Sequence, residues 1–263
     1  MSDTTQKPEH AHEIAKSEIS IFHQLQTHPN IVKFYEAFMV KKGYEYWIVM
    51  EYMDCNTLFD IVTHQHYLTT IWPTESQIAR ICCEILKGLH WIHTRNIIHK
   101  DIKSENILFN ENGDIKIADF GNSCRLDEDG KAEEQEAVGT CHWMAPEIIL
   151  EKAHNTKADI WSFGIVLHEI LVGLPPYNEV KEEELKNLIC NHPIPSPWEE
   201  NDIWSSPLQS LYNKCIIKDY NQRASAKELL EMNFFRLHDM NPQALKDLIF
   251  KLGKIGNSKE DSE

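Results

Sequence analysis

One stretch of the chain constrains its fold more than any other. Residues 157–172, KADIWSFGIVLHEILV, are apolar on nearly every face of a helix, and such a helix has to be surrounded by other elements inside a domain. The stretch is shorter than the about 20 residues that span a bilayer. Gly173 and Pro175-Pro176 predict its end. With 263 residues, the chain can form one large domain or two lobes that share a cleft.

Composition and charge exclude several classes of protein. The formal charge is −15, from 26 Lys and Arg against 41 Asp and Glu, and such a surface repels nucleic acid. It would favour basic peptides, or it serves only solubility. We expect no membrane span and no secretory signal, because no apolar run is long enough and no basic segment followed by an apolar one opens the chain. The seven cysteines form no C-x-x-C pair, which is typical of reduced thiols in a cytoplasmic protein.

Residue patterns divide the chain into four segments and predict an α+β fold. Polar residues dominate at the start, two runs rich in β-branched and aromatic residues follow, and helical periodicity governs most of the rest. The predicted segments are a disordered leader at 1–13, a helix with two strands at 14–53, a large helical part at 54–236 and a C-terminal tail at 237–263.

Particular elements can be placed within these segments. A helix is predicted over 14–25 and two strands over 31–40 and 44–50. Asn112-Gly113, between two short apolar runs, is a strong signal for a hairpin turn. The acidic residues 122–140 are predicted to form a mobile surface loop. Further helices are predicted at 182–190, 205–216, 225–232 and 245–252.

The predicted hairpin brings polar side chains together. The run from His99 to Asn106, HKDIKSEN, precedes it, and Asp119-Phe120-Gly121 follows it. Because a hairpin returns the chain to its starting end, we expect Asp101, Asn106 and Asp119 to converge on one cleft. Carboxylate and amide oxygens suit Mg²⁺, and a further carboxylate can orient an attacking hydroxyl. The pattern therefore predicts a site for phosphoryl transfer from a nucleotide.

Each motif alone has an ordinary structural explanation, since Asp-Phe-Gly is a turn tripeptide and a single His99 is more often a core residue. The order decides the matter: Ala145-Pro146-Glu147, then a DIWSFG run from Asp159, then Arg223 follow in turn, as in the protein-kinase signature. From about residue 14 to 236 the chain resembles kinases of the Sterile-twenty-like group, the p21-activated and germinal-centre kinases. The most specific matches are HPNIVKFYEAF, IVMEYMD, VGTCHWMAPE and KADIWSFGI.

The resemblance implies a bilobal protein-kinase-like fold with a mainly helical large lobe, and a serine/threonine kinase that uses ATP and Mg²⁺ on protein substrates. Asp101 would be the catalytic base and Lys103 would contact the γ-phosphate. Asn106 and Asp119 would hold Mg²⁺, and Thr140 would line the substrate site. A regulatory protein partner is a further candidate.

The resemblance also implies how the nucleotide would bind. Met50 would be the gatekeeper, Glu51, Tyr52 and Met53 would form the hinge that bonds adenine, and Leu108 would be the floor beneath it.

Other positions would act in structure and regulation. Glu18 matches the helix glutamate that pairs with the ATP-binding lysine. Glu147 would form a buried ion pair with Arg223, and Asp159 would brace the catalytic loop. The residues that would stack into a hydrophobic spine between the lobes are Phe22, Phe34, His99 and Phe120.

The sequence departs from the family in two respects. It holds neither a glycine-rich phosphate loop nor a V-A-I-K strand before Glu18, so the small-lobe sheet is expected to be incomplete. Lys100 replaces the usual Arg, and Glu136 stands where the group often carries a phosphorylated Thr. We expect Glu136 to be attracted to Lys100 in place of a phosphate.

Two alternatives stay open. One is a pseudokinase scaffold that transfers no phosphate, favoured by the absent loop and lysine. The other is a small-molecule phosphotransferase, against which Lys103, the Ala-Pro-Glu segment and Thr140 argue because they serve a protein substrate.

Overall fold

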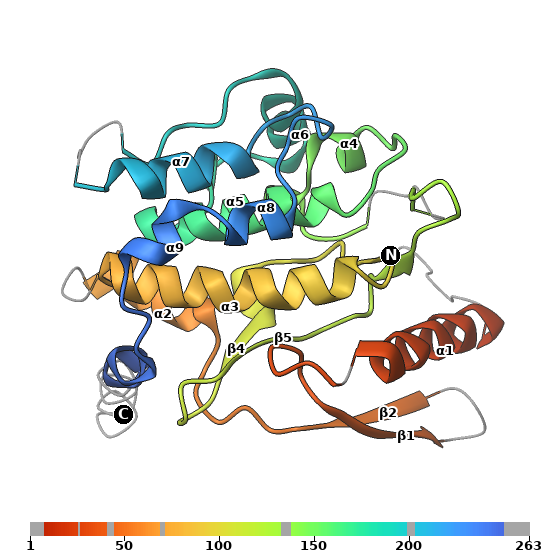
Figure 1. The fold of residues 1–263 in the computed structure, drawn as a ribbon. Helices are drawn as coiled ribbons and strands as arrows, with labels where there is room; N and C mark the ends of the chain where they lie inside the picture. Colours follow the sequence, from red (N-terminus) through yellow and green to blue (C-terminus); the bar gives the residue numbers. More distant parts are fainter. Residues whose placement is uncertain are drawn as a thin grey trace, which may run out of the picture.

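The structure is a computed structural model that describes residues 8–25, 27–40, 45–68, 72–132, 138–198 and 203–249. A helical body makes up most of it. A smaller part lies along one side and holds helix α1 (Pro8–Leu25) beside the antiparallel hairpin of β1 (Phe34–Val40) and β2 (Glu45–Met50) (Figure 1). This is the predicted α+β arrangement of two lobes.

Two long helices form the centre of the helical body, α3 (Glu75–His93) and α5 (Lys157–Val172). Every residue of α5 from Ala158 to Leu171 is buried, which confirms the prediction from its apolar sequence. Gly173 ends α5 in the left-handed conformation, with φ of 91°, which a glycine adopts without strain. Thr74 begins α3 through a capping box with Gln77.

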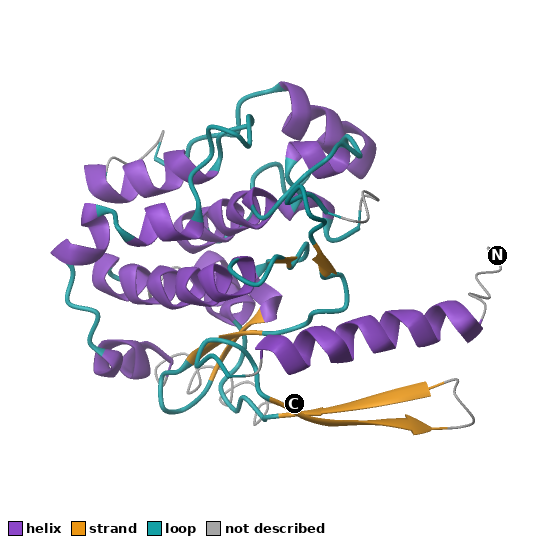
Figure 2. Cartoon of the chain, turned by 45° about the vertical axis from the view of Figure 1, so that its right-hand side comes forward, coloured by secondary structure: helices purple, strands orange, loops and turns teal. Residues whose placement is uncertain are grey.

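The other helices pack around these two, as Figure 2 shows. Helix α7 packs against α5, and α8 packs against α3. The helices around α3 and α5 are α2 (Leu58–Leu68), α4 (Pro146–Ile149), α6 (Glu182–Asn191), α7 (Ser206–Cys215), α8 (Ala226–Leu230) and α9 (Asn233–Leu237). Two short 3₁₀ turns accompany them, η2 (Ser104–Asn106) and η3 (Cys141–Trp143).

The predicted hairpin forms between β4 (Ile107–Phe109) and β5 (Ile115–Ile117), in which Ile107 pairs with Ile117. Its turn contains Gly113, whose φ of 76° again suits a glycine. The tail is also partly helical, over residues 242–249, and its Leu245 and Leu248 are buried.

Two expectations about segment boundaries were wrong. Helix α1 begins at Pro8, earlier than the predicted residue 14. A proline is compatible with this position, because the N–H that it lacks would have no partner in the first turn of a helix. The start of the predicted loop 122–140 is ordered, since β6 (Cys124–Arg125) pairs with β3 (Ile97–Ile98). Residues 1–7 of the predicted leader, 133–137 of the loop and the end of the tail lie outside the described residues.

None of the helices in the described ranges has both the length and the apolar character needed to cross a membrane.

Candidate active site

A compact set of hydrogen bonds connects residues just before the β4–β5 hairpin with the loop that carries Thr140. The Lys103 ammonium donates to Asp101 Oδ2 over 2.8 Å and to Thr140 Oγ1 over 2.9 Å. The Thr140 hydroxyl donates in turn to Asp101 Oδ1 over 3.0 Å. Asn106 Nδ2 donates to the Asp101 carbonyl oxygen over 2.8 Å. The structure thus brings together four of the residues that the sequence singles out.

The Asp101 carboxylate is held in its ionised form. Burial opposes the charge, but the hydrogen bond and the charge of Lys103, together with the Thr140 hydroxyl, outweigh burial and lower the pKa of Asp101. The group is therefore a hydrogen-bond acceptor across the neutral pH range.

Helix α5 supports the segment from His99 to Asn106, which the sequence predicts to be catalytic and which we call the catalytic turn. Both oxygens of Asp159 accept backbone N–H groups, Oδ2 from His99 and Oδ1 from Lys100, each over 3.0 Å. Asp159 is fully buried, and its Oδ2 also lies 2.8 Å from His93 Nε2. Burial opposes the Asp159 charge, but His93 and the other donors lower its pKa. The bracing role of Asp159 is thereby confirmed, whereas the sequence had given no hint of His93.

Gly139 brings the Thr140 loop against the catalytic turn. Its φ is 122°, and a Cβ at this position would lie 2.7 Å from the Lys100 carbonyl oxygen. A residue with a side chain would therefore push the loop away, and the hydrogen bonds of Thr140 to Asp101 depend on this close approach.

Asp119 follows β5 of the hairpin. It is exposed, with a positive φ of 64°, and its Oδ1 accepts the Gly121 N–H over 3.2 Å. The charges of Asp101 and Asp119 both act on the buried His99 ring, whose pKa burial nevertheless lowers. These aspartates therefore converge on one region, as the hairpin predicts.

The donor set of this region suits Mg²⁺. Asn106 engages its amide nitrogen with Asp101, so its amide oxygen is left for a cation, and the exposed Asp119 offers a carboxylate. Mg²⁺ takes few protein oxygens and completes its coordination shell with water and phosphate. The two oxygen ligands from Asn106 and Asp119 therefore suit Mg²⁺ better than a site fully enclosed by protein ligands would.

Aromatic side chains connect α1 to the catalytic turn. Phe22 stacks on Phe34 with ring centroids 5.4 Å apart and meets Phe120 edge-on at 5.2 Å. Phe120 contacts the His99 ring at 4.9 Å. The predicted spine is thus assembled in the structure.

Glu18 lies on α1 and is half-buried. Burial raises its pKa, and the nearby Asp119 carboxylate raises it further. Glu18 is thus close enough to Asp119 for their charges to interact, while its pairing with an ATP-binding lysine stays a prediction.

The connection between the two parts of the chain is fixed by Glu51. Its carboxylate accepts from Lys116 Nζ over 2.7 and 2.8 Å and from the backbone N–H of Lys33 over 2.5 Å. The side chain of Glu51 is therefore engaged with β5, and its backbone N–H donates to the Lys33 carbonyl oxygen over 2.9 Å. The remaining predicted cleft residues are Met50 and Tyr52, which are exposed, and Met53 and Leu108, which are half-buried.

Lys100 is buried and has a positive φ of 66°. The predicted attraction between Lys100 and Glu136 stays a prediction, because Glu136 lies outside the described residues.

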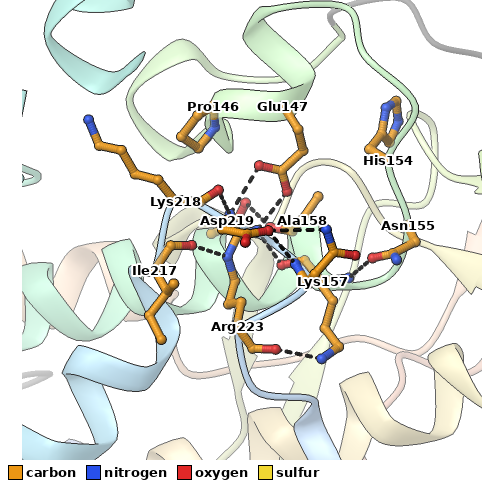
Figure 3. A network of polar contacts seen from close by, with 12 residues as sticks. Pro146, Glu147, His154, Asn155, Lys157, Ala158, Ile217, Lys218, Asp219 and Arg223 are labelled. Atoms are coloured by element: carbon orange, nitrogen blue, oxygen red, sulfur yellow. Dashed lines mark hydrogen bonds and ion pairs between the residues drawn. The ribbon is translucent and has the colours of Figure 1, made fainter. Parts of the chain in front are cut away.

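The predicted ion pair between Glu147 and Arg223 is present and fully buried (Figure 3). Arg223 Nη1 donates to Glu147 Oε1 over 2.6 Å and Nη2 to Oε2 over 3.0 Å. The guanidinium also donates to the carbonyl oxygens of Lys157 and Ile217, each over 2.8 Å. This bidentate pair joins the loop after Thr140 to the C-terminal helices.

Glu169 is a further buried carboxylate near the site, and the sequence reasoning missed it. It accepts from Ser104 Oγ over 2.8 Å and from Trp143 Nε1 over 2.7 Å. The available signal was a carboxylate within a largely apolar helix, where an unpaired charge is rare.

The two-lobed fold, the stacked spine and the Asp101–Lys103–Thr140 set define a domain of the protein kinase type. The family description "Protein kinase domain" matches residues 1–235. The chain belongs to the protein kinase family, and its relatives are Sterile-twenty-like kinases.

Three of these relatives indicate the degree of similarity. Serine/threonine-protein kinase shk2 of Schizosaccharomyces pombe is 39% identical, over 90% of this chain and 38% of the relative. Serine/threonine-protein kinase hippo of Drosophila melanogaster is 41% identical, over 86% and 32%. Serine/threonine-protein kinase STE20 of Candida glabrata is 36% identical, over 95% and 26%. The chain therefore spans well under half the length of these relatives.

Proposed function

We propose that the chain transfers the γ-phosphate of ATP to Ser or Thr hydroxyls of protein substrates. The observation that carries this proposal is the environment of the Thr140 hydroxyl, which donates to the Asp101 carboxylate and accepts from the Lys103 ammonium. An acceptor hydroxyl at the same carboxylate would be oriented for attack, with Lys103 beside the phosphate that it attacks.

The roles of the other residues follow from their positions. Asn106 and Asp119 would hold Mg²⁺, which supplies charge neutralisation for the phosphates. The backbone of Glu51 to Met53 would bond adenine, Met50 would act as gatekeeper and Leu108 would lie beneath the base. Because the pKa of Asp101 is lowered, we assign it the orientation of the hydroxyl and acceptance of its proton late in the transfer.

A pseudokinase scaffold is the second candidate. Ion pairs of the described residues include none to Glu18, and burial together with Asp119 raises its pKa. A glutamate with no ion pair among the described residues and with a raised pKa favours the scaffold, in which no lysine paired with Glu18 binds the phosphates.

The test is transfer of radiolabelled γ-phosphate by the purified chain with Mg²⁺, to a Ser/Thr protein substrate and, in parallel, to free small hydroxyl compounds. Label on Ser or Thr of the protein alone supports the proposal. ATP binding by calorimetry without transfer, or no binding at all, supports the scaffold. Label on the small compounds alone supports a small-molecule phosphotransferase.

A further inference from the structure

Residues 240–249 lie against the start of α3 and against the turn of the β4–β5 hairpin (Figure 1), and we call them the C-terminal strap. Residues 242–249 of the strap are helical. Leu245 and Leu248 are three positions apart, so they share one face of this helix, and both are buried in the core of the helical body. The strap is therefore docked on that body through apolar side chains.

Two side chains of α3 fasten the strap by hydrogen bonds to its backbone. Gln77 Nε2 donates to the Ala244 carbonyl oxygen over 2.7 Å, and Arg80 Nη1 donates to the Met240 carbonyl oxygen over 3.4 Å. Gln77 also belongs to the capping box of α3, because its Oε1 accepts the Thr74 N–H over 2.8 Å. One side chain thus both begins α3 and holds the strap.

The strap covers one residue of the hairpin turn. The turn is exposed at Glu111 and Asp114, but Gly113 between them is buried. A Cβ on Gly113 would lie 3.1 Å from Lys246 Cγ and 3.4 Å from the Pro242 carbonyl oxygen. The strap therefore packs directly on the backbone of the turn.

The hairpin also contacts the segment that follows the predicted hinge. The Glu111 N–H donates to Asp54 Oδ1 over 2.9 Å. Phe109 of β4 accepts from the Cys55 N–H over 3.1 Å and donates its own N–H to the Asn56 carbonyl oxygen over 3.2 Å. The hairpin thus lies between the strap and the segment that leads from the expected adenine site.

We propose that the C-terminal strap is a positioning element for the nucleotide site and that Gln77 fastens it. This inference rests on the nucleotide site of the proposed function. The hairpin carries Leu108 and connects Asn106 to Asp119, so its position sets the positions of all three. Release of the strap removes the support of the turn on one side. The hairpin then moves relative to the hinge, and ATP binds less tightly.

The structural half of the proposal is tested by hydrogen exchange at pH 7. Gln77→Glu keeps an oxygen for the Thr74 N–H, so the capping box survives, but it has no donor for Ala244. Thr74→Ala is the matched control, because it removes the hydroxyl of the box and leaves the Gln77 donor in place. The Gly113 amide, which donates to the Asn110 carbonyl oxygen over 2.9 Å, should exchange about 2- to 10-fold faster in Gln77→Glu. It should exchange as in wild type in Thr74→Ala. Wild-type exchange in Gln77→Glu, or equal acceleration in both variants, overturns the proposal.

The functional half is tested by calorimetric titration with ATP and Mg²⁺. The dissociation constant should rise about 2- to 10-fold in Gln77→Glu, because a coupled site loses at most what the contact contributes. It should rise further in Leu245→Ala and stay unchanged in Leu237→Ala, the control at a leucine that is 58% exposed. The kcat at saturating ATP should be retained in Gln77→Glu, whereas a general loss of folded protein would lower it. If Leu245→Ala does not fold, Gln77→Glu decides the test, since it removes one hydrogen bond.

The outcomes separate this proposal from the proposed function. Transfer by the wild-type chain with an unchanged dissociation constant in Gln77→Glu and Leu245→Ala overturns the positioning role and leaves the kinase function standing. ATP binding without transfer overturns the proposed function alone, and the dissociation constants still decide the role of the strap. A wild-type chain that neither binds ATP nor transfers phosphate overturns both.

Discussion

The ammonium of Lys103 donates to the carboxylate of Asp101 over 2.8 Å, and this contact sets the charge of the buried aspartate. Burial alone would favour the neutral acid. The neighbouring cation reverses that preference, so the reactivity of one residue depends on the other.

Lys103→Met should therefore change the pH profile as well as the rate. Without the cation, burial raises the pKa of Asp101, and the acid limb of kcat/KM should move to higher pH. The rate at neutral pH should fall about 10²-fold or more, as for loss of a group that stabilises developing charge. The measurement is kcat/KM from pH 5 to 8 for both proteins. An acid limb in the same place would contradict the coupling.

Gly139→Ala should displace the Thr140 loop. Its Cβ would lie 2.7 Å from the Lys100 carbonyl oxygen, so kcat should fall about tenfold or more. Gly130→Ala is the matched control, because Gly130 also has a positive φ, of 73°, but nothing lies within 4 Å of its Cβ position. Backbone strain is common to both variants, and equal kcat values in the two would contradict a steric role for Gly139.

Arg223→Ala should destabilise the helical body strongly, because it leaves the Glu147 carboxylate buried without its partner. The expected loss is about 3–5 kcal/mol in the free energy of unfolding. Arg223→Lys keeps the charge but not the two parallel hydrogen bonds, and should recover only part of the loss. Chemical denaturation of the three proteins measures this. A loss below about 1 kcal/mol, as for an exposed pair, would show that the contact contributes little.

His168 should make stability depend on acid pH. Burial lowers its pKa to about 4 from an ordinary value of 6.5. The unfolded chain therefore takes up a proton that the folded chain refuses, and stability falls as pH drops from 6.5 to 4. The loss from this group is about 3 kcal/mol over that range. In His168→Gln this part of the acid loss should be absent, and unfolding midpoints measured at pH 7 and pH 4 compare the two proteins.

Residues close in sequence were the easiest to predict. The hairpin turn at Asn112-Gly113 predicted from local pattern that Asp101 and Asp119 would converge, because the geometry of a turn is set by its own residues. The contact of Glu147 with Arg223 spans 76 positions, and only the resemblance to protein kinases implied it.

Glu169 and His93 were missed for a physical reason. An apolar helix predicts burial but not what its few polar residues touch, and both partners of Glu169 lie in segments that only the tertiary fold brings to α5. The early start of α1 at Pro8 was missed because periodicity of apolar residues marks the buried face of a helix and not its polar first turns.

The most direct test of the proposed function is the rate of phosphate transfer by Asp101→Asn beside the wild-type chain. Asparagine preserves the shape of the side chain and cannot accept the proton of the acceptor hydroxyl. We predict a fall in kcat of about 10²- to 10⁴-fold, with the unfolding transition retained. A wild-type chain that transfers phosphate and an Asp101→Asn variant that matches its kcat would contradict the assignment of the active site.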